Sequence, residues 1–112
     1  MDLDAVVTAL KSHENDFVAA YIFGSVVLGN NDDFSDVDLL IIRDTDAPFF
    51  DRIREIMDLR KEFGAADFLI YTPSELESFL SEQGRYFIRE IIQKGIKIEG
   101  KQKRSRTLVE PS

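Results

Sequence analysis

Two aspartates, Asp36 and Asp38, open the apolar run VDLLII. Alternate residues of a β-strand face the same side about 6.5–7 Å apart, so both carboxylates would project together while Val37 faces the opposite layer. Two charges at that separation repel by roughly 2 kcal/mol at an effective dielectric of about 20. No Lys or Arg lies between Lys11 and Arg43 to offset them. Alone, the pair fits either the hydrophilic start of an exposed strand or a metal site.

A third aspartate, Asp67, begins a second apolar run, ADFLIY. The segment between the two runs has the length of a helical crossover, which makes neighbouring strands parallel. Parallel strands start at the same end of a sheet, so we expect Asp67 to lie near Asp38. The preceding run, FVAAYIF, is joined to VDLLII by a short connection, and antiparallel pairing would bring Gly24 and Ser25 to the same end.

Carboxylates gathered in this way suit Mg²⁺ or Mn²⁺, which prefer oxygen ligands. The chain has no Cys and one His, His13, which argues against zinc. Such a site is typical of metal-assisted phosphoryl or nucleotidyl transfer. Gly24 would let a phosphate approach the backbone, and Ser25 would donate a hydrogen bond to it. By themselves, Gly24 and Ser25 also fit an ordinary turn between a strand and a helix.

The elements that position these residues alternate between helices and short strands. We expect a turn of helix at 25–28, and the loop 29–35 carries Asp32 and Asp33 into solvent. On the last helix, helical spacing places Phe87 and Ile91 in the core, with an interface as the alternative. The predicted helices are 3–15, 48–63, 73–80 and 85–94, and the predicted strands are 17–23, 37–42, 66–71 and 96–98. The pattern predicts an α/β domain around a short sheet.

Composition is consistent with one domain of 112 residues that has its own core, since 44% of the residues are hydrophobic. The net charge of −7 disfavours direct binding of nucleic acid. The N-terminus lacks the features of a signal peptide, and no apolar run approaches the length of a membrane span. We therefore expect a soluble, cytoplasmic protein. The basic stretch 101–106 predicts a solvated tail, or else a patch for an acidic partner.

The spacing Gly24-Ser25, ten residues, Asp36-Val37-Asp38 resembles the GS-x10-DxD signature of the nucleotidyltransferase superfamily that includes DNA polymerase beta. Over roughly residues 4–99 the chain is similar to the short branch called minimal nucleotidyltransferases. This resemblance implies the α/β (α+β) nucleotidyltransferase fold, a short mixed sheet flanked by helices. It implies a nucleotidyltransferase domain over residues 1–100, followed by a basic tail over 101–112.

The resemblance also implies roles for single residues. Gly24 and Ser25 would hold the triphosphate of ATP, while Asp36, Asp38 and Asp67 would ligate Mg²⁺ or Mn²⁺ and perform catalysis, with Asp67 as the base. The chain has Leu28 where relatives commonly carry an Arg, which predicts weaker triphosphate binding but leaves the metal site intact.

Many minimal nucleotidyltransferases are antitoxins of a HEPN-family ribonuclease toxin, and some transfer AMP to a toxin tyrosine. The resemblance therefore implies adenylylation of a partner protein, in a homo- or hetero-oligomer and without contact to a membrane. Two alternatives remain open at this point. One is a non-catalytic antitoxin that neutralises its partner by covering it, and the other is nucleotidyl transfer to a small molecule.

Overall fold

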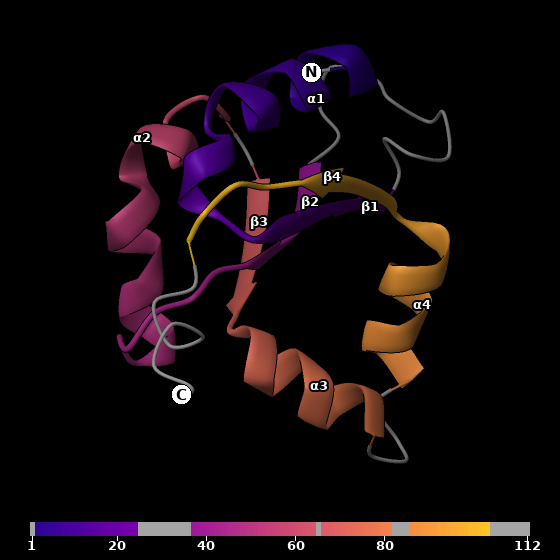
Figure 1. Cartoon of the computed structure of the whole chain (residues 1–112). Helices are drawn as coiled ribbons and strands as arrows, with labels where there is room; N and C mark the ends of the chain where they lie inside the picture. The colour runs from indigo at the N-terminus through magenta and orange to yellow at the C-terminus, as the bar shows by residue number, and fades with distance from the viewer. Residues whose placement is uncertain (1, 25–36, 65, 82–85, 104–112) are drawn as a thin grey trace.

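The computed structural model of the protein describes residues 2–24, 37–64, 66–81 and 86–103. Within these ranges, a four-stranded sheet of order β3-β2-β1-β4 lies between two layers of helices (Figure 1). The strands are β1 Ala19–Phe23, β2 Val37–Ile42, β3 Ala66–Tyr71 and β4 Ile96–Glu99. β2 and β3 are parallel, whereas β1 is antiparallel to both β2 and β4. The sheet is therefore mixed, as predicted.

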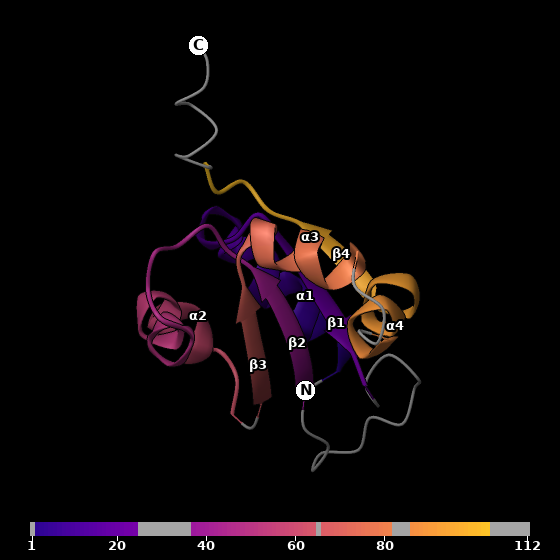
Figure 2. The same cartoon turned by 90° about the horizontal axis from the view of Figure 1, so that it is seen from below.

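The helices divide between the two faces of the sheet (Figures 1 and 2). One face carries α1 Leu3–Ser12, the 3-10 helix η2 Phe49–Ile56 and α2 Met57–Arg60, and the other carries α3 Pro73–Ser81 and α4 Tyr86–Lys94. A short 3-10 turn, η1 Glu14–Asp16, follows α1. Among the described residues, no helix is long and apolar enough to cross a membrane.

The central strand β2 is buried on both faces, which explains its unbroken apolar sequence. Leu39 and Ile41 pack toward α1 and α2, while Leu40 and Ile42 pack toward α3 and α4. Each of these four side chains is at most 2% exposed. The alternation along β2 places Asp38 on the face of α3 and α4, because it has the same parity as Leu40.

The prediction of one helix over 48–63 is only partly right. The chain forms eight residues of 3-10 helix before the four residues of α2. The guanidinium of Arg52 donates to the carbonyls of Ala47 at 2.9 Å and Ile70 at 3.0 Å, and these bonds hold the segment close to β3. The spacing of the apolar residues predicts a helix here but does not distinguish 3-10 from α winding.

Arg52 also fixes the start of α3. It forms a two-pronged ion pair with Glu75, at 2.7 Å and 3.0 Å. Glu75 in turn accepts from the backbone N–H of Thr72, whose hydroxyl accepts from the N–H of Glu75. This reciprocal pair is a capping box. The sequence pattern predicts a helix that begins at residue 73, but it does not predict this capping box.

Replacing Arg52 with methionine is expected to lower the free energy of unfolding by about 2 kcal/mol, since hydrogen bonds to charged groups are each worth roughly that much. The side chain of Arg52 is only 8% exposed, so methionine would fill similar space without the donors. Urea denaturation measures the change. Arg54→Met is the matched control because that side chain is 81% exposed. Equal stability of the two variants would contradict this role of Arg52.

The ion pair also predicts a pH dependence. The hydrogen bond from Arg52 lowers the pKa of Glu75 below its ordinary value of 4.5. A lowered carboxyl pKa contributes stability that is present above the unfolded value and is lost as the pH falls through the folded one. The difference in unfolding free energy between wild type and Glu75→Gln should therefore be constant from pH 5.5 to 7 and shrink below about 4.5. Glu77→Gln, exposed on the same helix, is the matched control for the loss of one carboxylate.

Candidate active site

Asp38 is held in place by the buried strand around it. Its neighbour Val37 is 3% exposed and packs into the core on the α1 side. Asp38 therefore projects to the opposite face, where it is half-buried at the open end of the sheet. Strand geometry, rather than a flexible side chain alone, fixes the direction in which the carboxylate points.

Asp67 lies beside Asp38 on the neighbouring parallel strand. The register pairs Asp38 of β2 with Asp67 of β3, so both side chains project from the same face. Neighbouring strands are about 4.8 Å apart, which brings the two carboxylates close together. Asp67 is exposed at its position on the edge strand. The parallel pairing predicted from the length of the crossover is confirmed.

Gly24 ends β1 directly against Asp38. The antiparallel register pairs Phe23 with Asp38, and the chain then turns at Gly24 with a φ of 89°. This left-handed conformation is strained for any residue that has a Cβ. A Cβ at Gly24 would also overlap Oδ2 of Asp38 and lie 3.1 Å from its Cγ. Two features therefore require glycine at position 24. One is the positive φ of the backbone, and the other is the Asp38 carboxylate that leaves no space for a Cβ.

Two of the predicted site residues, Ser25 and Asp36, lie outside the described residues, as do Leu28, Asp32 and Asp33. Their predicted roles stay predictions. Gly24, Asp38 and Asp67 are the predicted site residues that the structure describes, and it places all three at one end of the sheet.

The donor atoms at this end fit Mg²⁺ when it is shared with a phosphate. Among the described residues, no three His, Cys, Asp or Glu side chains gather into a group that would hold a metal ion. Asp38 and Asp67 nevertheless supply two adjacent carboxylates. Mg²⁺ is commonly bound through one or two carboxylates, and phosphates of the substrate complete its octahedral shell. Without a Cβ at Gly24, the Asp38 carboxylate lies directly against the backbone of Gly24, so a phosphate bound there would meet both.

Phe23, on β1, is a neighbour of Asp38 that the sequence pattern did not reveal. Phe23 is directly opposite Asp38 across the β1–β2 pair, and directly opposed residues share a face. Phe23, Asp38 and Asp67 thus form a row across three adjacent strands, with an aromatic ring at one end and carboxylates at the other. The position of Phe23 directly before Gly24, at the end of an antiparallel strand, was the sequence feature that could have predicted this contact.

A mixed sheet between helices, with carboxylates on two parallel strands and a glycine ending the antiparallel strand beside them, defines a nucleotidyltransferase domain. The comparison with family models agrees. The chain matches the family described as "Polymerase beta, Nucleotidyltransferase" over residues 5–104, and it belongs to that family.

Similarity to individual proteins is more distant. A crystal structure of a Sulfolobus solfataricus protein, provisionally described as a nucleotidyltransferase, is 25% identical to the chain, with a TM-score of 0.46. The match covers 65% of this chain and 66% of that one, slightly under two-thirds of its length. None of the curated proteins compared with the chain matches it.

Proposed function

We propose that the protein is a Mg²⁺-dependent nucleotidyltransferase that transfers AMP from ATP to a hydroxyl group of a partner protein. The observation that carries this proposal is the pairing of Asp38 with Asp67 on adjacent parallel strands, with Gly24 against the Asp38 carboxylate. Two adjacent carboxylates beside a glycine backbone suit a substrate that brings both a metal ion and phosphates.

Each side chain then has a defined task. Asp38, central in the row, would orient the α-phosphate, while the backbone at Gly24 would lie along the outer phosphates. Asp67 would accept the proton of the attacking hydroxyl as its oxygen bonds to the α-phosphorus and the bond to pyrophosphate breaks. When bound, Mg²⁺ would supply charge stabilisation for the phosphate oxygens in the transition state.

We further propose that the acceptor is a tyrosine of a HEPN-family ribonuclease toxin, so that the protein acts as an antitoxin. Support comes from the resemblance to minimal nucleotidyltransferases over residues 4–99 and from the net charge of −7, which disfavours RNA as acceptor. A purely covering antitoxin has no need for adjacent carboxylates, whose mutual repulsion costs stability.

The test uses the protein, the product of its neighbouring gene, ATP labelled at the α-phosphate, and Mg²⁺. We expect the label to appear on a tyrosine of the partner, identified by mass spectrometry, and the partner's activity to fall in parallel. The Asp36→Ala/Asp38→Ala variant should bind the partner without labelling or silencing it. If this variant silences the partner as well as wild type does, the protein acts by covering. Label found only on small molecules would exclude the protein acceptor.

A further inference from the structure

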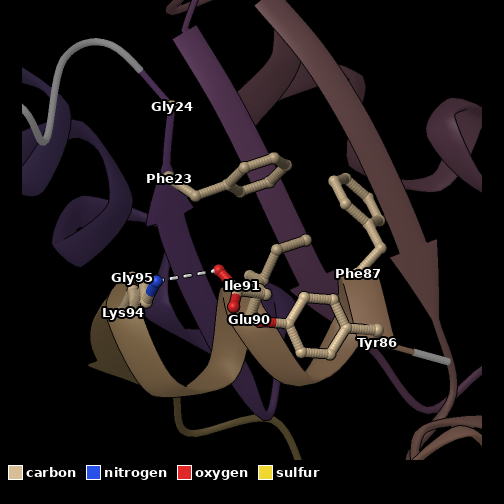
Figure 3. Close-up of a pocket in the computed structure, with 8 residues that line it drawn as sticks. All are labelled: Phe23, Gly24, Tyr86, Phe87, Glu90, Ile91, Lys94 and Gly95. Carbon is tan, nitrogen blue, oxygen red and sulfur yellow. Dashed lines mark ion pairs between the residues drawn. The ribbon is translucent and has the colours of Figure 1, made fainter.

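A cavity of about 620 Å³ lies between the end of β1 and α4, on the face of the sheet that carries Asp38 (Figure 3). Phe23 and Gly24 line it from β1, and α4 contributes one face of its helix, including Tyr86, Phe87 and Ile91. Its volume is in the range typical of small-molecule sites. The predicted active site uses Gly24 but none of the residues from α4.

The walls of this cavity are aromatic and open to solvent. The rings of Phe23 and Phe87 meet edge to face, with centroids 6.0 Å apart and an interplanar angle of 82°. Phe87 is nonetheless 59% exposed, and Tyr86 is 69% exposed. Ile88 and Ile91 already anchor α4 to the core, so these two aromatic side chains are not needed to hold the helix in place.

The cavity has little net charge to hold a phosphate. Its charged residues, Glu90 and Lys94, form an ion pair with Nζ and Oε1 3.1 Å apart (Figure 3). Hydrogen bonds from Tyr86 and Lys94 lower the pKa of Glu90, so its carboxyl is ionised at neutral pH. The charge of Lys94 is already neutralised by Glu90, so the cavity offers little attraction to a triphosphate. A flat, weakly polar ring would instead pack against the aromatic side chains of the cavity.

The cavity lies at one end of the row formed by Phe23, Asp38 and Asp67. Phe23 is directly opposite Asp38, and Asp38 is directly opposite Asp67, so the cavity lies on the side of Asp38 away from Asp67. In AMP transfer the attacking hydroxyl and the leaving pyrophosphate lie on opposite sides of the α-phosphorus, while the ribose stays bonded to that phosphorus. With Asp67 on the acceptor's side, the cavity lies away from the acceptor and adjoins Gly24, where the nucleotide is proposed to bind.

We propose that this cavity receives the nucleobase and ribose of the nucleoside triphosphate, with the base stacked against Phe87 and Tyr86. The proposal rests on the proposed function, because it assumes that a nucleoside triphosphate binds at Asp38. Aromatic side chains stack with every base, so this contact contributes affinity for nucleosides in general.

The test compares Mg²⁺-ATP with Mg²⁺-tripolyphosphate, which lacks base and ribose, by calorimetry on the full chain. Phe87→Ala should weaken ATP binding about tenfold, as expected for the loss of one stacking partner. The same variant should bind tripolyphosphate as wild type does. Phe87→Tyr, which keeps the ring, should restore ATP affinity. Phe50→Ala is the matched control, since Phe50 is 89% exposed on η2.

The outcomes separate this proposal from the function on which it rests. If ATP binds wild type and Phe87→Ala equally well, the cavity is not the nucleoside site, although the function stands. Unchanged ATP affinity with loss of partner labelling would assign the cavity to the partner protein and overturn the proposal. Equal weakening of ATP and tripolyphosphate would show a general disturbance and overturn it too. If wild type binds neither compound, both the proposal and the function fail.

Discussion

Asp38→Asn is expected to slow nucleotidyl transfer about a thousandfold. Asparagine keeps the size and one oxygen of the side chain but removes the charge. Electrostatic stabilisation of a phosphoryl transition state through a bound metal is worth several kcal/mol, and each 1.36 kcal/mol corresponds to tenfold in rate. Asp38 is central in the row of site residues, between Phe23 and Asp67, and it is the carboxylate that lies against Gly24. Initial rates of AMP transfer at saturating Mg²⁺ and ATP measure the effect.

A matched control separates chemistry from folding. Asp58 is exposed on α2, on the opposite face of the sheet, so Asp58→Asn should retain the wild-type rate. Circular dichroism and urea denaturation should show that Asp38→Asn stays folded, because removing one of two neighbouring like charges relieves repulsion. A rate for Asp38→Asn within threefold of wild type would place the chemistry elsewhere.

Gly24→Ala is expected to produce the second large loss, of about a hundredfold in transfer rate. The new Cβ would overlap the Asp38 carboxylate, so either that side chain or the end of β1 must move. A misplacement of about 1 Å in a catalytic site can cost on the order of a hundredfold. The backbone adds its own penalty, since a φ of 89° costs a non-glycine residue roughly 1–2 kcal/mol. Transfer rates and urea denaturation together measure both effects.

Gly64 offers the control for this substitution. A Cβ at Gly64 has nothing within 4 Å, so Gly64→Ala should leave both rate and stability nearly unchanged. A Gly24→Ala variant as active as Gly64→Ala would mean that the approach of Gly24 to Asp38 has no part in the reaction.

Strand positions were predictable because burial on two faces leaves a clear sequence signal. VDLLII and ADFLIY correspond residue for residue to β2 and β3. The length of the crossover predicts their parallel pairing, and that pairing places Asp67 beside Asp38. The register between β2 and β3 was predictable because each aspartate is the second residue of its strand, and the two strands begin at the same end of the sheet.

Features that depend on single long-range contacts were not predictable. The contacts of Arg52 on η2 are one example, because its partners come from β3 and α3. Helical spacing predicts core positions for Phe87 and Ile91. Ile91 is 3% exposed, which confirms the prediction, but Phe87 is 59% exposed. Both residues lie on the same apolar stripe of α4, so helical spacing does not distinguish the covered residue from the exposed one. The cavity beside Phe23 was not predictable either, because β1 and α4, which line it, are far apart in the sequence.

The proposal that a metal ion and ATP bind beside Asp38 is tested most directly by locating Mn²⁺-ATP with NMR of the isotopically labelled protein. Paramagnetic Mn²⁺ broadens the signals of nuclei close to it. We predict that Mn²⁺ with ATP broadens the backbone amide signals of Gly24, Asp38 and Asp67 first, and that Asp38→Asn abolishes this broadening. Broadening centred on another face, or equal broadening in wild type and Asp38→Asn, would contradict the assignment of this site.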